Sequence, residues 1–330
     1  MKVVSFDKLV SWVGQRVSAK EIFSLDHTCM NEYAFQQKFV DYLSASRITT
    51  VSPYYVQTFL RRYIELIERS GEEMAEELYE IYCGELLGAK QLDVSDKEVI
   101  TYHVGGFGSG AGTSDHTVKI YEAPRLISGS NTTGLRTWEA ALYLSNYLNT
   151  HPYDWSGKTV LELGGGTGLL SLALTKQPLK EIIITDGSAA LIDNLSETLH
   201  MNAIDNGPTI KCHQLLWGTT NPNSPDFVQG PPANVDVVVA ADVTYDSSIL
   251  DVLATTISDF LQSGTKMALI AATVRNEQTI ADWNASLDRW FDGQWSVVNS
   301  CAVPGDIDSL CWFRERTPEI RVYEIRAKLG

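Results

Sequence analysis

Three consecutive glycines, Gly164–Gly166, interrupt an otherwise apolar stretch and form the most distinctive feature of the sequence. The stretch reads VLELGGGTGLLSLAL from Val160 to Leu174, so we expect a buried strand before the glycines and a helix after Gly168. Glycine has no Cβ, which lets the backbone turn sharply and approach a ligand closely. Glu162 adds a carboxylate two residues before the first glycine. The spacing therefore predicts a binding loop suited to a ligand that carries positive charge.

The same glycines could belong to a dinucleotide-binding loop. That fingerprint reads Gly-x-Gly-x-x-Gly, and counted from Gly164 its third glycine would fall on Leu169. A carboxylate at Glu162 would also raise the cost of binding a pyrophosphate. The amino group and the sulfonium of S-adenosylmethionine are positive, so this cofactor is the predicted ligand, with NAD as an alternative.

Two later strand ends carry acidic side chains. ITDG places Asp186 at the carboxyl tip of the next strand, 22 residues after Gly164. A carboxylate there can accept hydrogen bonds from both ribose hydroxyls, although this holds for S-adenosylmethionine and NAD alike. Asp186 could instead be a turn residue, but Ser188 is expected to cap the following helix and leave Asp186 free for the ligand.

The stretch VDVVVAADVTYDSS ends a third apolar strand at Ala241 and Asp242. Tyr245 follows three residues after Asp242, so a carboxylate and a phenol are predicted at the rim where the reactive end of the ligand would point. Asp246 or Ser247 can also be read as the N-cap of the next helix.

The elements that must position these residues alternate between strand and helix from about Thr133 onward. Apolar strands alternating with amphipathic helices predict an α/β, Rossmann-like fold with a mostly parallel sheet covered on both faces. The segment before the last strand is too short for a crossover helix, so the seventh strand is expected to return antiparallel beside the sixth. We expect the strands near 159–163, 181–185, 209–216, 235–241, 266–273, 295–303 and 320–329, and helices over 137–149, after Gly168, and over 188–202, 248–261 and 277–291.

The rest of the chain divides into two smaller parts. Residues 1–95 show helical periodicity, and residues 96–128 predict a β-hairpin, which leaves 129–330 for the α/β domain. The glycine-rich middle of the hairpin, Gly105–Gly112, lacks the Gly-Lys-Ser/Thr of a phosphate loop. The glutamates of 71–87 predict either a solvated helix face or a surface that docks a basic partner.

Composition narrows the class of partner and the compartment. The 330 residues carry a formal net charge of -15, which opposes non-specific binding to nucleic acid. No apolar run is long enough for a membrane helix, and five scattered cysteines without a Cys-x-x-Cys pair fit a reducing compartment. The six histidines show no metal-ligand spacing. We therefore expect a cytoplasmic protein without a metal, a membrane or a nucleic acid as its partner.

Several stretches together resemble the seven-β-strand protein-lysine methyltransferases, and within them the members that modify eukaryotic elongation factor 2. They are TGLRTWEAALYLSNYL, GKTVLELGGGTGLL, ITDG, LLW, AADVTYD and AATVRNEQT. The resemblance implies a class I methyltransferase sheet, S-adenosylmethionine as cofactor and a protein substrate, elongation factor 2. A methyltransferase for another protein, a small molecule or a nucleic acid is the second interpretation, an NAD-dependent oxidoreductase the third, and a non-catalytic cofactor-binding protein a fourth.

The resemblance also implies roles for single residues. Trp138 would border the methionine end of the cofactor, Gly164, Gly165 and Gly166 would line it, Asp186 would hold the ribose, Trp217 would flank the adenine and Ala241 would contact the cofactor through its backbone. Gly165 stands where relatives often carry Ala or Ser, which predicts a slightly looser loop. Tyr245 is predicted to accept a hydrogen bond from the incoming amine, and Asp242 to steer the positive side chain inward.

Overall fold

The computed structural model describes residues 2–107, 116–129, 132–202, 207–221, 223, 232 and 234–327. They form two compact units, which are described separately. Most of the glycine-rich middle of the hairpin, and the last residues predicted for the seventh strand, lie outside the described residues.

The first unit comprises Met1–His103, Phe107–Leu126 and Asp308–Trp312. Its longest helix begins with Pro53, which suits a first helical turn, and stops at Gly71, whose φ of 75° is left-handed. Between them one apolar face is buried, as the periodicity predicts: Val56, Phe59, Leu60, Tyr63, Ile64 and Ile67. The helices of this unit are α1 (Phe6–Gly14), α2 (Ala19–Ile22), α3 (Tyr33–Ser46), α4 (Ile48–Val51), α5 (Pro53–Ser70) and α6 (Glu76–Glu80), with a 3-10 turn at Thr28–Asn31 and a π-helical turn at Ile81–Glu85.

The predicted hairpin is present and packs with these helices. Strands β1 (Glu98–His103) and β2 (Thr117–Glu122) pair antiparallel, from Glu98 opposite Glu122 to His103 opposite Thr117. Contacts therefore group the hairpin with the helical unit, and residues 308–312, although distant in sequence, belong to it as well.

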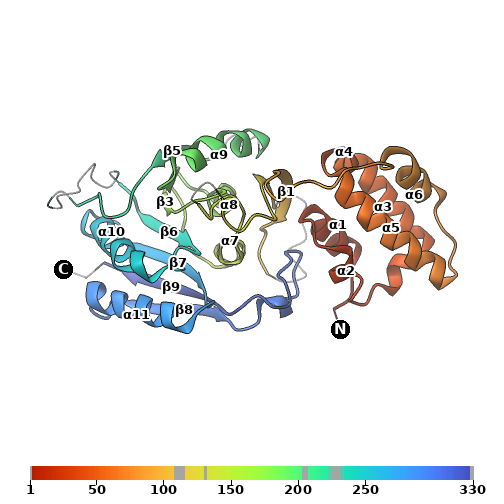
Figure 1. The fold of residues 1–330 in the computed structure, drawn as a ribbon. Helices are drawn as coiled ribbons and strands as arrows, with labels where there is room; N and C mark the ends of the chain where they lie inside the picture. The colour runs from red at the N-terminus through yellow and green to blue at the C-terminus, as the bar shows by residue number, and fades with distance from the viewer. Residues whose placement is uncertain are drawn as a thin grey trace. The chain divides into compact units, whose positions relative to one another are not determined.

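The second unit is built on the predicted seven-stranded sheet, in the order β5-β4-β3-β6-β7-β9-β8 (Figure 1). The strands from β3 to β7 are parallel, and β9 is antiparallel to both of its neighbours, β7 and β8. The strands are β3 (Thr159–Leu163), β4 (Glu181–Asp186), β5 (Thr209–Gln214), β6 (Val237–Ala241), β7 (Met267–Thr273), β8 (Trp295–Cys301) and β9 (Ile320–Arg326). The predicted fold class and the antiparallel last strand are thus confirmed.

Helices cover both faces of this sheet. Alternate side chains of each strand point to opposite faces, and one face packs against α10 (Leu250–Gln262) and α11 (Glu277–Phe291) in a continuous apolar core. Helices α7 (Glu139–Thr150), α8 (Leu169–Leu174) and α9 (Ala189–Asn202) lie on the other side in Figure 1. The strand order reverses at β3, which lies between β4 and β6, and this switch opens a crevice beyond the carboxyl ends of the strands.

Candidate functional site

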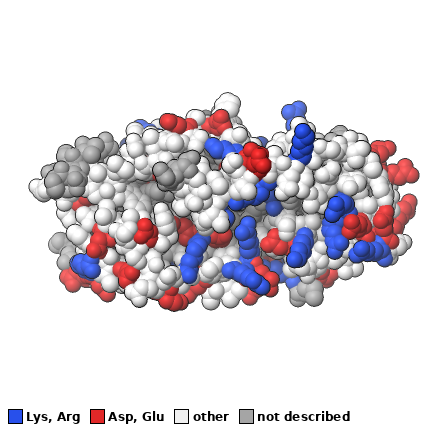
Figure 2. Space-filling model, in the orientation of Figure 1, with Lys and Arg blue, Asp and Glu red and all other residues white. Residues whose placement is uncertain are grey.

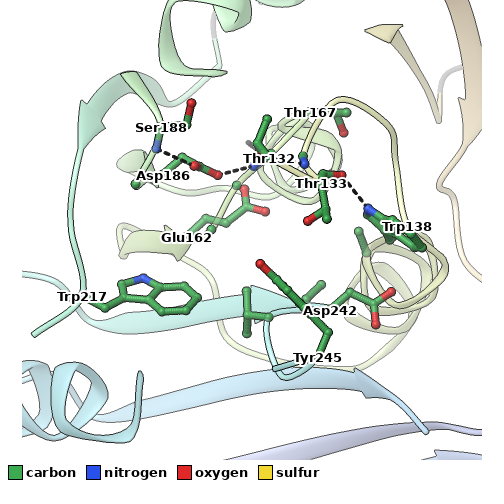
Figure 3. Close-up of a pocket in the computed structure, with 18 of the residues that line it drawn as sticks. Thr132, Thr133, Trp138, Glu162, Thr167, Asp186, Ser188, Trp217, Asp242 and Tyr245 are labelled. Carbon is green, nitrogen blue, oxygen red and sulfur yellow. Dashed lines mark hydrogen bonds between the residues drawn. The ribbon is translucent and has the colours of Figure 1, made fainter. Parts of the chain in front are cut away.

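A cavity of about 580 Å³ lies at this switch point, entirely within the second unit (Figure 3). Its volume is in the range typical of small-molecule sites. Every residue predicted for the site lines it: Trp138, Glu162, Gly164, Gly165, Gly166, Asp186, Trp217, Ala241, Asp242 and Tyr245. The fold thus gathers residues from four strand ends and from the start of α7 around one space.

The glycine loop is closely packed. Gly164 has a φ of 66°, and a Cβ there would stand 2.8 Å from Val243 Cγ1. A Cβ on Gly165 would stand 2.6 Å from Ile184 Cγ2. The looser loop expected from the glycine at position 165 is therefore not observed, because the side chain of Ile184 fills the space that a larger residue would need.

Asp186 lies at the end of β4, and its side chain connects the glycine loop with the turn that precedes α9. Its Oδ2 accepts a hydrogen bond from Gly166 N at 3.0 Å, and its Oδ1 accepts one from Ser188 N at 2.9 Å. Burial raises the pKa of this carboxyl, and the backbone N–H groups act in the opposite direction. The expectation that Ser188 would leave Asp186 free needs correction, because Asp186 itself accepts hydrogen bonds from the turn and from the glycine loop.

Glu162 is a buried acid beside the loop. The residue is 3% exposed, and its Oε2 accepts hydrogen bonds from the backbone and the hydroxyl of Ser171. Burial raises the pKa of Glu162 to about 7, against the effect of the Ser171 hydrogen bonds. A cation in the cavity would stabilise the ionised form, so Glu162 is suited to pair with a positively charged ligand.

Tyr245 and Trp217 supply the aromatic surface of the cavity. Figure 3 shows the Tyr245 side chain directed into the cavity from the loop after β6. The residue is 58% exposed, and its hydroxyl has no hydrogen-bond partner in the described part of the chain. Trp217 lies against the glycine loop, since a Cβ on Gly164 would stand 3.4 Å from its ring. A phenol hydroxyl is thus available to a second molecule at the mouth of the cavity.

Comparison with known proteins decides the family. Residues 121–283 match the family model described as lysine methyltransferase. The protein-lysine N-methyltransferase EFM3 of Saccharomyces cerevisiae is 32% identical over 297 residues, which cover 78% of this chain and 82% of that protein. The human protein-lysine N-methyltransferase EEF2KMT is 29% identical over 250 residues, covering 71% of this chain and 70% of the relative. The chain belongs to the protein-lysine methyltransferase family.

The cavity of this methyltransferase fits S-adenosylmethionine, the cofactor of its reaction. Two carboxylates, Glu162 and Asp186, face a ligand that is positive at its amino group and its sulfonium. The glycine loop and the flat ring of Trp217 line the same cavity, and its volume is large enough for a nucleoside. Family membership also sets aside the NAD-dependent interpretation.

Asp242 has protein partners that its sequence position does not reveal. Its Oδ2 accepts a hydrogen bond from Ala140 N at 3.1 Å, its Oδ1 accepts one from Thr273 N at 3.2 Å, and Arg275 lies 3.3 Å away. The carboxylate therefore caps the N-terminus of α7. Direct steering of a substrate by Asp242 stays a prediction. Asp246 caps the turn after β6 by accepting a hydrogen bond from Ser248 N at 2.9 Å, as the alternative interpretation expected.

Sequence reasoning missed the irregular segment before α7. Thr132, Thr133, Gly134 and Thr137 all line the cavity of the methyltransferase. Trp138 Nε1 donates to the carbonyl of Thr133 at 2.8 Å, and the hydroxyls of Thr137 and Thr167 are 2.9 Å apart. Irregular backbone leaves no hydrophobic periodicity, so the stretch TGLRTW could be noticed only as a resemblance.

Proposed function

We propose that this protein transfers a methyl group from S-adenosylmethionine to the side-chain amine of a lysine on eukaryotic elongation factor 2. The observation that carries the proposal is the cavity itself, where the buried carboxylate of Glu162, the half-buried carboxylate of Asp186 and the glycine loop meet the Tyr245 phenol, which has no hydrogen-bond partner among the described residues. The choice of substrate is supported by the human relative EEF2KMT, by its name a lysine methyltransferase of elongation factor 2. The free cysteines suit a reducing compartment such as the cytoplasm.

The proposed cofactor contacts follow the walls of the cavity. Asp186 would accept hydrogen bonds from the ribose hydroxyls with the lone pairs that Gly166 and Ser188 leave open. Trp217 would flank the adenine, and the backbone of Ala241 would contact the cofactor beside it. Glu162 would balance the positive charge at the methionine end, which Trp138 borders; Gly164, Gly165 and Gly166 line the space between.

When bound, the cofactor would supply an electrophilic methyl group that a neutral amine attacks in line. The new N–C bond forms as the C–S bond breaks, and S-adenosylhomocysteine leaves as a neutral thioether. Only a neutral amine has the lone pair to attack, whereas a free lysine has a pKa of about 10.4. The protein must therefore favour loss of the lysine proton to water by desolvating the ammonium, and then hold the nitrogen in place. The Tyr245 hydroxyl would accept a hydrogen bond from the amine and fix its direction. Positioning supplies most of the rate acceleration, and no strong base is needed.

A labelling experiment tests the proposed function. The purified protein is incubated with methyl-labelled S-adenosylmethionine and an extract of cells that lack it, alongside purified elongation factor 2. We expect one labelled band, at the size of elongation factor 2, with the label on a lysine. Label on a different protein would refute elongation factor 2 as the substrate, and label on small molecules or nucleic acid alone would refute a protein substrate.

A further inference from the structure

A cluster of charged side chains surrounds Trp138 at the edge of the cavity, and we call it the arginine clamp. It consists of Arg136, Trp138, Glu139, Asp242 and Arg275. The guanidinium carbons of Arg136 and Arg275 lie over the Trp138 ring, 4.4 and 4.8 Å from its centroid. Glu139 pairs with both arginines, at 3.2 and 2.7 Å, and Arg275 also pairs with Asp242 at 3.3 Å. Two cations and two anions thus form a charge-balanced group around one aromatic ring.

The clamp joins three segments that meet at the cavity. Arg136, Trp138 and Glu139 come from the start of α7, Asp242 from the end of β6, and Arg275 from the turn between β7 and α11. Each charged member except Arg275 has a side chain at most 20% exposed, and Arg275 itself is 35% exposed. Ion pairs at this degree of burial are less screened than surface pairs, and several members share partners.

Asp242 is the strained point of this arrangement. Its φ is 54°, a left-handed conformation that costs a residue other than glycine free energy and persists only where the surroundings enforce it. Its carboxylate provides that restraint through the hydrogen bonds from Ala140 N and Thr273 N and the pair with Arg275. The turn that begins at Asp242 leads directly to Tyr245.

The position of Tyr245 depends on this turn. Its hydroxyl has no hydrogen-bond partner in the described residues and its ring is more than half exposed, so few contacts of its own hold it. The backbone that Asp242 fixes must therefore set where the phenol points. Any group that holds the Asp242 carboxylate acts on the phenol through that backbone.

We propose that Arg275 is a positioning residue for methyl transfer, which holds Asp242 and Glu139 together and thereby fixes Tyr245 at the acceptor side of the cavity and Trp138 at its edge. This inference rests on the proposed function. The inference goes beyond the proposed function because it gives a role to a residue that we place in contact with neither the glycine loop nor the substrate. Arg275 is absent from the residues that line the cavity.

The first test is a comparison of Arg275→Gln and Arg275→Lys with the matched control Arg289→Gln. Arg289 also pairs with a carboxylate, Asp251, in the same unit, but both side chains are more than half exposed and the pair lies outside the clamp. We expect Arg275→Gln to lower kcat by at least about tenfold, equivalent to about 1.4 kcal/mol of barrier. The affinity for S-adenosylhomocysteine, measured by calorimetry, should change by less than about threefold, which is below about 0.7 kcal/mol. Arg275→Lys should restore part of kcat, and Arg289→Gln should match the wild type.

The pH dependence of kcat distinguishes a positioning role of Arg275 from a purely structural one. Asp242 faces Arg275 and Glu139, together with the N–H groups of Ala140 and Thr273. Burial raises the pKa of Asp242 and Arg275 opposes that effect, so loss of the guanidinium should raise this pKa further. Protonated Asp242 is a poorer acceptor for two N–H groups. The ratio of kcat for Arg275→Gln to kcat for the wild type should therefore fall as the pH is lowered.

A third measurement does not depend on methyltransferase activity. The indole Nε–H of Trp138, assigned in ¹⁵N-tryptophan spectra by its loss in Trp138→Phe, should shift in Arg275→Gln and keep its position in Arg289→Gln. Wild-type kcat and pH dependence in Arg275→Gln would overturn the inference. So would a parallel loss of kcat, cofactor affinity and melting temperature that Arg275→Lys does not restore. Failure of the wild type to methylate any protein would instead refute the proposed function, and the indole resonance would still test the clamp.

Discussion

Gly165 is the most tightly packed residue of the glycine loop. A Cβ there would stand 2.6 Å from Ile184 Cγ2, which is closer than side-chain carbons approach. We expect Gly165→Ala to lower the free energy of unfolding by about 1–3 kcal/mol, the usual cost of overpacking. In an Ile184→Ala background the same change should cost clearly less, because the obstructing methyl group is gone. Urea unfolding of the four proteins of this double-mutant cycle measures the coupling.

Gly84→Ala is the matched control for the loop substitution, because no described residue beyond its chain neighbours and the backbone of its own helical turn lies within 4 Å of a Cβ at that position. It should leave the free energy of unfolding within about 0.5 kcal/mol of the wild type. Equal costs for Gly165→Ala in the two backgrounds would show that Ile184 is not the obstacle.

Glu162 makes stability and cofactor binding depend on pH. Its folded pKa of about 7 exceeds its ordinary value of 4.5, so between these pH values the folded state binds more protons than the unfolded state. This contribution to stability is fully present below about pH 4.5 and is lost as the pH rises to about 7, by an amount on the order of 3 kcal/mol. The free energy of unfolding of Glu162→Gln should therefore rise relative to the wild type over this range.

The same group should release a proton when a cation binds. Calorimetric titration of S-adenosylmethionine near neutral pH, in two buffers with different heats of ionisation, should give different apparent enthalpies for the wild type. Glu162→Gln should give the same enthalpy in both. Buffer-independent enthalpies for the wild type would count against contact between Glu162 and a positive group.

Asp186 and Tyr245 should separate binding from turnover. Asp186→Asn keeps one carbonyl acceptor for the surrounding N–H groups but loses an acceptor for the ribose, so cofactor affinity should fall about tenfold, or about 1.4 kcal/mol.

Tyr245→Phe keeps the ring and should lower kcat by about tenfold or more while leaving cofactor affinity unchanged. Calorimetry and initial rates measure the two effects. A Tyr245→Phe variant with full turnover would remove the phenol from the mechanism.

At the scale of elements, the strands and helices of the second unit were predictable because each is long and strongly patterned. The helix over Glu277–Phe291 was placed residue for residue. The insertion of β9 between β7 and β8 was not predicted beyond its antiparallel pairing with the strand before it, because an apolar pattern does not reveal the second neighbour of a strand. Arg275 was missed for a similar reason: its partners Glu139 and Asp242 are far away in sequence and reach it only through the sheet order.

The N-terminus of α11 gives a prediction at this scale. The Asn276 side chain accepts hydrogen bonds from Gln278 N at 2.8 Å and Thr279 N at 3.4 Å, so it caps the helix that begins directly after Arg275. Asn276→Ala should lower the free energy of unfolding by about 1 kcal/mol, whereas Asn276→Ser should keep most of the stabilisation that the cap provides. Thermal unfolding monitored by circular dichroism measures both. Equal melting temperatures for Ala and Ser would show that this cap does not stabilise the helix.

At the scale of the whole molecule, two features of the helical unit decide which variants can test whether it binds the substrate. They are its exposed glutamates and its contact with residues 308–312. Figure 2 shows acidic side chains gathered at the end of this unit where α5 runs into α6, and Glu72, Glu73, Glu76 and Glu80 are exposed there. Docking of a basic substrate surface on these glutamates stays a prediction beside the solvated-face interpretation. Deleting the region before Ser95 would also remove the partners of residues 308–312, so substitution of the glutamates is the cleaner test.

The attachment of residues 308–312 to α1 is specific. The Gln15 side chain donates to the carbonyl of Trp312 at 2.7 Å and accepts from its N–H at 2.9 Å, so one amide pairs with both backbone groups. The Trp312 ring meets Trp12 edge to face at 4.9 Å, and Ser11 Oγ donates to the carbonyl of Leu310 at 2.7 Å. Sequence could not predict this contact, because 297 positions separate Gln15 from Trp312.

Gln15→Ala should free this segment without altering the cofactor site. It leaves the Trp312 N–H and carbonyl without their partner, at a cost of about 1–3 kcal/mol to local stability. Hydrogen exchange of the peptide spanning 308–313 should accelerate, while the exchange of the glycine loop and the affinity for S-adenosylmethionine stay at wild-type values. Gln37→Ala is the matched control, since among the described residues the hydrogen bonds of the Gln37 side chain go only to side chains of the same unit. Weaker cofactor binding in Gln15→Ala alone would show instead that anchoring of this connection between β8 and β9 supports the methyl-transfer site.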